Sequence, residues 1–141
     1  MTPQEKLNQL AVGLNGATGF NGLVFSTELM PGDVDVLILT LGDREEFPIY
    51  ITVDESQILC ITHLWTETEV NPAKKMDLLD ALLTLNIPIP LSSFSKIGQQ
   101  YVIFGALSIH SSLDQVIEEV DTLSDNTLTA VEELSAYLLK K

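Results

Sequence analysis

Cysteine is nearly absent from this chain, with Cys60 standing alone among 141 residues. A lone cysteine excludes an internal disulfide, so an apolar core has to hold the fold. Basic residues are scarce too, because seven Lys and Arg stand against twenty Asp and Glu and give a formal net charge of -13. A field of that sign repels the phosphates of nucleic acids and of anionic lipids, whereas it attracts basic protein segments. The composition therefore argues against a nucleic acid partner.

Long hydrophobic runs are also missing. No apolar stretch approaches the roughly 20 residues of a membrane-spanning helix, so no direct membrane insertion is expected. Residues 1–5 lack the basic and apolar regions of a secretory signal, which, with the lone cysteine, predicts a cytoplasmic location. Of all residues, 45% are apolar and 19% charged, as in folded chains. We expect residues 1–141 to form a single globular domain.

Strand patterns dominate the middle of the chain. Residues 34–65 contain three apolar, β-branched runs separated by the polar turns GDREE and DESQ, which predicts an antiparallel meander. Residues 92–97 and 101–109 form a predicted hairpin around residues 98–100. Residues 25–29 alternate as a short strand or an extended segment. Together these patterns predict a five-stranded antiparallel sheet.

Helix signals flank those strands. Thr2 with Glu5, and Ser112 with Gln115, form capping boxes before apolar residues at helical spacing. Residues 71–72, Asn-Pro, open another helix between them. Residues 124–127 are poor helix formers, which favours a break in the C-terminal helix over one bent helix. The order helix, three strands, helix, two strands and helix predicts an α+β architecture.

Several of these elements are apolar on more than one face. The runs 36–41, 58–65 and 101–107 are apolar on both faces, and the helix after Pro72 has a wide apolar arc. We expect a symmetric homodimer or a protein client to bury this surplus; the alternative is cover by the C-terminal helices of the same chain. The predicted apolar partner-binding residues are Met76, Leu79, Leu82, Leu83 and Trp65.

Acidic side chains gather in the two turns of the meander. The prediction is an acidic patch for a basic partner, made of Asp43, Glu45, Glu46, Asp54 and Glu55. Later acidic residues, Glu118, Glu119 and Asp121, are interpreted as the solvated face of a C-terminal helix.

Residues that could carry chemistry are few. Cys60 and His63 lie three apart on a predicted strand, so their side chains point to opposite faces and form no direct dyad. His110 could in principle approach either one. Two His and one Cys are a thin supply for a metal site. The glycine-rich loop 16–22 follows a helix and leads to a strand, which is the reverse of a phosphate-binding loop. No metal or cofactor is expected.

Two resemblances accompany these patterns. The element order resembles the type III secretion chaperone fold and the related YbjN-like domains, in which it builds a small dimer. The segments FPIYITVDESQILCITHLW, LNIPIPLSSFSKIGQQYVIFGALS and LSDNTL, with the helix start at residues 71–72, resemble the YjfI-like bacterial family of unknown function. Its members tend to be encoded near proteins similar to phage-shock protein A, so the resemblance implies a membrane-stress setting. It supplies no catalytic residues to carry over.

The sequence as a whole predicts a non-enzymatic cytoplasmic interaction module, adaptor-like or chaperone-like. It would act as a homodimer and hold a protein client through a basic or apolar segment of that client. The alternative is a small enzyme or ligand-binding domain that uses the neighbourhood of Cys60, His63 and His110.

Overall fold

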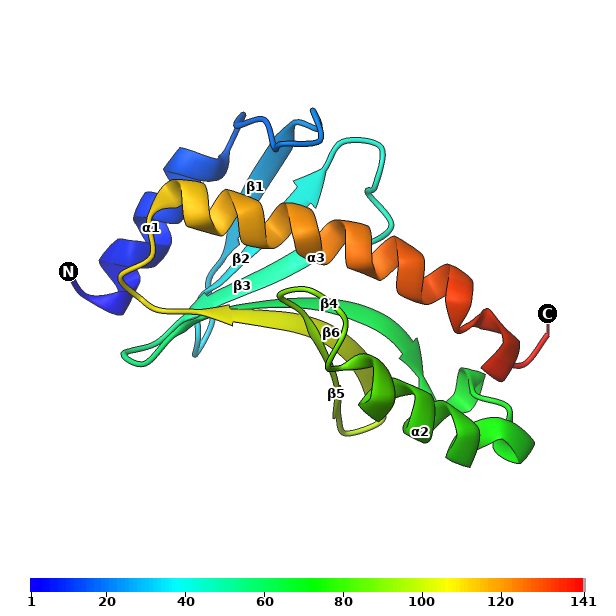
Figure 1. Ribbon diagram of the computed structural model, residues 1–141. Coiled ribbons are helices and arrows are strands. Elements are labelled where there is room, and N and C mark those ends of the chain that lie inside the picture. Colours follow the sequence, from blue (N-terminus) through cyan, green and yellow to red (C-terminus); the bar gives the residue numbers. More distant parts are fainter. Residues whose placement is uncertain (141) are drawn as a thin grey trace.

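The computed structural model describes residues 1–140 as an antiparallel sheet with three α-helices (Figure 1). The sheet has six strands in the order β1-β2-β3-β4-β6-β5. The strands are β1 (Phe25–Met30), β2 (Val36–Leu41), β3 (Ile49–Val53), β4 (Ile58–Thr66), β5 (Ser93–Ile97) and β6 (Gln100–Leu107). The helices are α1 (Pro3–Leu14), α2 (Lys75–Leu85) and α3 (Leu113–Glu133), with 3-10 turns at Glu67–Glu69, Pro72–Lys74 and Ser135–Tyr137.

The α+β class is confirmed, but the prediction of five strands is wrong. Segment 25–30 is a full strand that pairs with β2 from Phe25 opposite Leu41 to Met30 opposite Val36. Its apolar signal is weak because β1 lies at the sheet edge, where only Phe25 is buried. An edge strand needs little apolar alternation, so the pattern alone left its state open.

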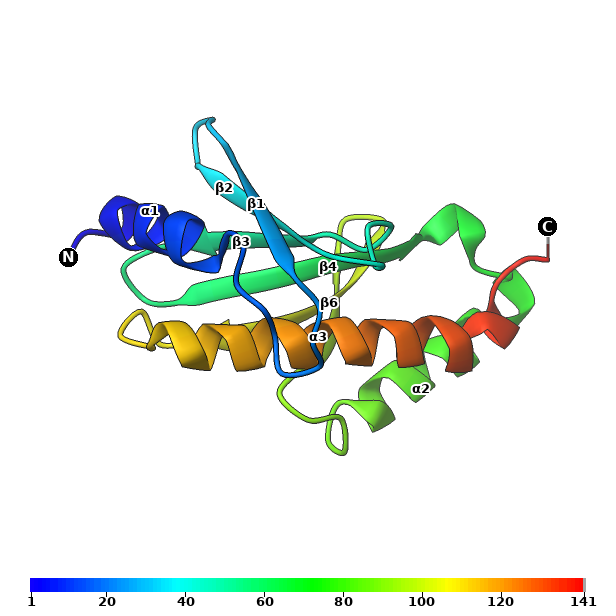
Figure 2. The same cartoon turned by 90° about the horizontal axis from the view of Figure 1, so that it is seen from above.

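All three helices pack on one face of the sheet, which we call the inner face. Its core includes Leu39, Ile51, Ile58 and Ile103, all fully buried. Helix α3 runs alongside β4 for most of that strand. Helix α2 lies next to the C-terminal half of α3 (Figure 2). Helix α1 joins the same face, since the Thr27 hydroxyl on β1 donates to the Ala11 carbonyl oxygen (2.8 Å). The opposite, outer face has no helix from the described part of the chain.

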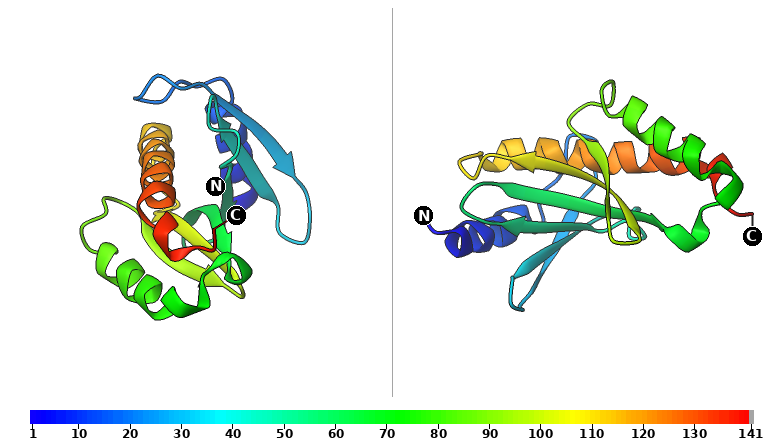
Figure 3. Two further views of the ribbon diagram at one scale, coloured as in Figure 1. Left: turned by 90° about the vertical axis from the view of Figure 1, so that its right-hand side faces the viewer. Right: turned by 90° about the horizontal axis from the view of Figure 1, so that it is seen from below.

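The sheet curls around these helices. Viewed along α3, the hairpin β1-β2 turns away from the β5-β6 end, and α2 and α3 lie on the same side of the sheet (Figure 3). The end of the chain returns to the end of β4, where Val70 forms a bridge with Leu138. The C-terminal turn therefore closes the core near α2.

Helix α3 is continuous, so the predicted break at residues 124–127 is wrong. The poor helix formers there find partners that keep the helix intact. The Thr127 hydroxyl donates to the Leu123 carbonyl oxygen (2.7 Å), and Asn126 donates to the Pro90 carbonyl oxygen (2.8 Å). Arg44 binds both Ser124 and Asp125. The contacts of Asn126 and Arg44 join α3 to distant segments, which local propensity does not register.

Candidate partner-binding surfaces

Cys60, His63 and His110 do not meet. Cys60 lies fully buried on the inner face, where burial, with a smaller contribution from the charge of Glu119, raises the pKa of its thiol far above the usual range. His63 is exposed on the outer face, with its ring 4.9 Å from that of Tyr50. His110 follows β6 in a loop. The expected opposition of Cys60 and His63 is confirmed, and the enzyme alternative loses the cluster on which it depended.

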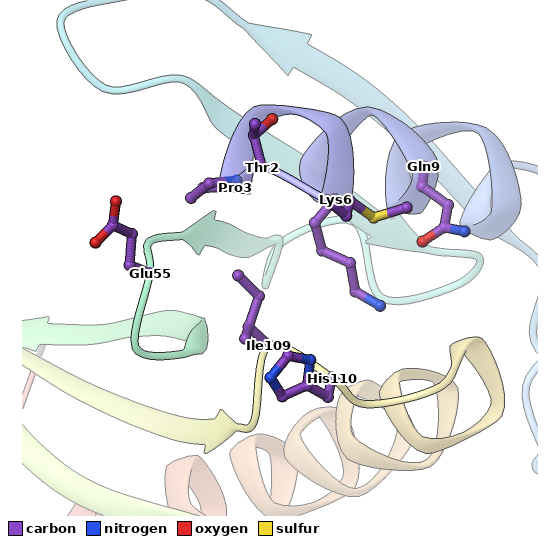
Figure 4. A pocket seen from close by; sticks show the side chains of 8 residues that line it. Thr2, Pro3, Lys6, Gln9, Glu55, Ile109 and His110 are labelled. Atoms are coloured by element: carbon purple, nitrogen blue, oxygen red, sulfur yellow. The ribbon is translucent and has the colours of Figure 1, made fainter.

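One pocket of about 560 Å³, with both polar and apolar lining residues, does include His110 (Figure 4). It lies between the start of α1, Glu55 in the β3-β4 turn, and the loop after β6. Lys6 extends from α1 toward that loop and donates to the Ser111 carbonyl oxygen (2.7 Å). The ammonium group of Lys6 is therefore already bound to the backbone of the same chain. Within residues 1–140, no group of three His, Cys, Asp or Glu residues could hold a metal ion.

The apolar arc of α2 divides between core and surface. Trp65 is only 3% exposed and Leu82 only 7%, so neither side chain is open to a partner. Met76 and Leu83, in contrast, are 78% and 72% exposed. Half-buried Leu79 lines an apolar groove of about 330 Å³ between α2 and β5. We use the term α2 stripe for Met76, Leu79 and Leu83.

The predicted acidic patch is not one patch. Asp43, Glu45 and Glu46 lie in the β2-β3 turn, whereas Asp54 and Glu55 lie in the β3-β4 turn. Five residues of β3 separate the two groups by roughly 17 Å. The side chain of Asp54 is also engaged locally, because hydrogen bonds from Ser56 and Gln57 lower its pKa. The acids therefore flank the sheet at two ends.

The outer face of the sheet carries an apolar surface that no helix covers. One continuous row crosses all six strands: Glu28, Ile38, Tyr50, Ile61, Phe104 and Ser93. A neighbouring row holds Thr52, Leu59 and Ala106. The central side chains Ile38, Tyr50 and Ile61 are half-buried, although no helix of the described chain covers them. The apolar pattern on both faces of the strands was the sequence signal for this surface. The predicted partner-binding residues, in contrast, lay only on α2 and at Trp65.

Both edges of this sheet are partly occupied by side chains and loops of the same chain. At β1, the Phe25 N–H donates to the Ala17 carbonyl oxygen (2.8 Å), and the Thr27 N–H donates to the Asn15 side chain (3.1 Å). At β5, the Asn86 side chain accepts from the Phe94 N–H (2.6 Å) and donates to the Phe94 carbonyl oxygen (3.4 Å). Such caps oppose strand-to-strand pairing with another chain.

Two acidic side chains of α3 are buried, so their assignment to the solvated face is wrong. Asp121 accepts a hydrogen bond from the Phe20 N–H in the glycine-rich loop, and burial raises its pKa. Glu119 is 5% exposed and lies against Gly105, where an added Cβ would overlap its carboxylate. Burial, with the charge of Glu118, raises the pKa of Glu119 to about 7. Gly19 and Phe20 of the loop 16–22 thus lie against the carboxylate of Asp121.

This architecture is an α+β fold that is similar to the fold of type III secretion chaperones and of YbjN. YbjN from E. coli shares the fold with a TM-score of 0.57 and 16% identity, over 98% of this chain and 93% of that one. A chain of the heterodimeric complex ExoU-SpcU from the type III secretion system of Pseudomonas aeruginosa shares it with a TM-score of 0.51 and 13% identity, over 75% and 80%. At these identities the likeness concerns the fold alone.

The chain belongs to the family of uncharacterized proteins conserved in bacteria designated DUF2170, whose model matches residues 4–138. It is 29% identical over 107 residues to the uncharacterized protein YjfI of Escherichia coli K12, covering 73% of this chain and 79% of YjfI. The YjfI of E. coli O157:H7 matches equally. These findings confirm both resemblances. None of the helices within residues 1–140 has the length and apolar character needed to cross a membrane.

Proposed function

We propose that this protein is a non-enzymatic, cytoplasmic protein-interaction module, adaptor-like or chaperone-like, that works as a homodimer and holds a protein client on the α2 stripe. The observation that carries the proposal is the exposure of large apolar side chains on a well-formed helix, next to an apolar groove. Apolar groups held open to water in this way are typical of binding surfaces. The scattered positions of Cys60, His63 and His110 favour this class over an enzyme.

The chemistry of the stripe indicates the kind of client. Asp80 is exposed and lies four residues after Met76 and three before Leu83, so it interrupts the apolar row on the same side of the helix. An amphipathic segment with apolar residues around one Lys or Arg would match this row. The chain's net charge of -13 would draw such a segment in. The YjfI-like resemblance adds membrane stress as the expected setting.

Site-specific photo-cross-linking in bacterial cells tests the client site. A photoreactive phenylalanine analogue replaces Leu83, and a matched control replaces Val12, which is 80% exposed on α1. We expect a protein adduct at position 83 that the additional substitution Met76→Asp abolishes, and no such adduct at position 12. A synthetic peptide from the cross-linked region should then bind the purified chain and lose at least tenfold in affinity with Met76→Asp.

Two outcomes would contradict the client site. One is the same set of adducts at positions 83 and 12, which would indicate random collision. The other is a specific adduct at position 83 whose peptide binds Met76→Asp and the unchanged chain equally well.

A further inference from the structure

We propose that the outer face of the sheet is the interface for a second copy of this chain, packed sheet against sheet around a two-fold axis. This proposal rests on the homodimer of the proposed function and specifies which surface of the chain forms the dimer interface. The interface centre is the row Ile38, Tyr50, Ile61 and Phe104, at the middle of four neighbouring strands. Sheets that pack face to face lie about 10 Å apart and interdigitate such side chains.

Charge identifies the occupant as a second copy. The chain carries twenty acidic residues, yet Glu28 is the sole Asp, Glu, Lys or Arg at an outward position of the six described strands, and it lies on edge strand β1. A surface for a basic partner would present acids among its apolar residues. A two-fold interface places like surfaces together, so acids near its centre would repel their own copies. The outer face has almost no charged residues although the chain is strongly acidic, which fits a two-fold interface better than a surface for a basic partner.

The capped edges direct contact to the face. Asn86 occupies the free edge of β5 at Phe94, and the loop at residues 15–17 occupies the free edge of β1. A partner that extended the sheet by adding a strand would have to displace these bonds. Packing on the outer face requires no bond to break, because outward side chains rather than backbone groups make the contact.

The exposed surface area of the chain leaves room for an interface of ordinary size. The described chain exposes 7850 Å². A compact monomer of 15.5 kDa typically exposes about 7200 Å². A standard dimer interface removes roughly 800 Å² from each subunit, which would bring the exposed area of this chain to an ordinary value.

Sedimentation velocity over a concentration series tests the interface with four matched variants. Ile61→Asp places a charge at the interface centre between Tyr50 and Phe104. Thr52→Lys places one at a half-buried polar position of the same face, where the substitution is mild for folding. Met76→Asp on the α2 stripe and Val12→Asp on α1 are the controls. They introduce the same negative charge as Ile61→Asp, but at exposed positions outside the outer face. Circular dichroism spectra and melting curves establish that each variant is folded.

We expect the unchanged chain, Met76→Asp and Val12→Asp to sediment as dimers, and folded Ile61→Asp and Thr52→Lys to dissociate at least a hundredfold more readily. If Ile61→Asp fails to fold, Thr52→Lys decides the matter. A dimer that survives Thr52→Lys but dissociates with Met76→Asp would overturn the sheet interface and leave the proposed homodimer standing. An unchanged chain that sediments as a monomer at 100 μM would overturn both, while the client site on α2 would still be tested by cross-linking.

Discussion

Glu119 shows how one side chain can work against the stability of its own fold. It lies between α3 and β6 against Gly105, and one of its carboxylate oxygens is buried without a hydrogen-bond partner among the described residues. Burial raises its pKa from 4.5 to about 7. The folded state therefore binds a proton that the unfolded state has already released between about pH 4.5 and 7, so this residue lowers stability as pH rises through that window.

Glu119→Gln should remove this pH dependence, because an amide keeps the shape and carries no charge. We expect the variant to be more stable than the unchanged chain at pH 8, by on the order of 2 kcal/mol, and to differ little at pH 5. Urea unfolding at several pH values measures the difference. Glu132→Gln, at an exposed position of the same helix, is the control and should stay within about 0.5 kcal/mol throughout. An advantage at pH 5 equal to that at pH 8 would refute the account.

Local sequence signals anticipated some residues and missed others for a physical reason. The capping boxes at Thr2 and Ser112 form as predicted, because each joins residues three apart. The close approach at Gly105 was also open to inference from a glycine inside a strand. The burial of Glu119 and Asp121 was not, since it depends on Gly105 and on the loop at residues 19–21, which are distant in the chain.

At the scale of elements, side chains from remote segments support α3 at its middle and occupy the free edge of β5. Arg44 in the β2-β3 turn forms an ion pair with Asp125 (2.7 Å) and binds Ser124, at the place where α3 was expected to break. The same principle operates at β5, whose free edge is satisfied by Asn86 just beyond α2. The hydrophobic periodicity of the sequence predicted the type of each element. The continuity of α3 and the bonds at the β5 edge depend on contacts between distant residues, so local sequence did not reveal them.

Asn86→Ala should open the β5 edge. The variant loses both hydrogen bonds to Phe94, which should cost about 1 to 2 kcal/mol and leave an unpaired strand edge exposed. Chemical denaturation measures the loss, and thioflavin T fluorescence at high protein concentration measures edge-to-edge aggregation. Asn8→Ala, at an exposed position of α1, is the matched control. Equal stability and equal aggregation of both variants would show that Asn86 does not protect the edge.

At the scale of the whole molecule, three helices cover one face of the sheet, and no helix of the described chain covers the other. The sequence predicted strands with two apolar faces and so a need for further cover. It did not say which face the helices would take, because the outward row of Ile38, Tyr50 and Ile61 is as apolar as several inward positions. The placement of α1, α2 and α3 on one side settles that choice and leaves a charge-poor face exposed.

Cysteine labelling on the outer face tests the central claim most directly. Thr52→Cys places a reactive thiol there, and Ser135→Cys places one at an exposed site near the C-terminal end of α3. Native Cys60 is buried with a raised thiol pKa, so it adds little background. We predict that maleimide labelling at position 52 slows at least tenfold when the protein is raised from 100 nM to 100 μM, while labelling at position 135 keeps its rate. Equal rates at position 52 over that range would contradict a dimer formed through the outer face of the sheet.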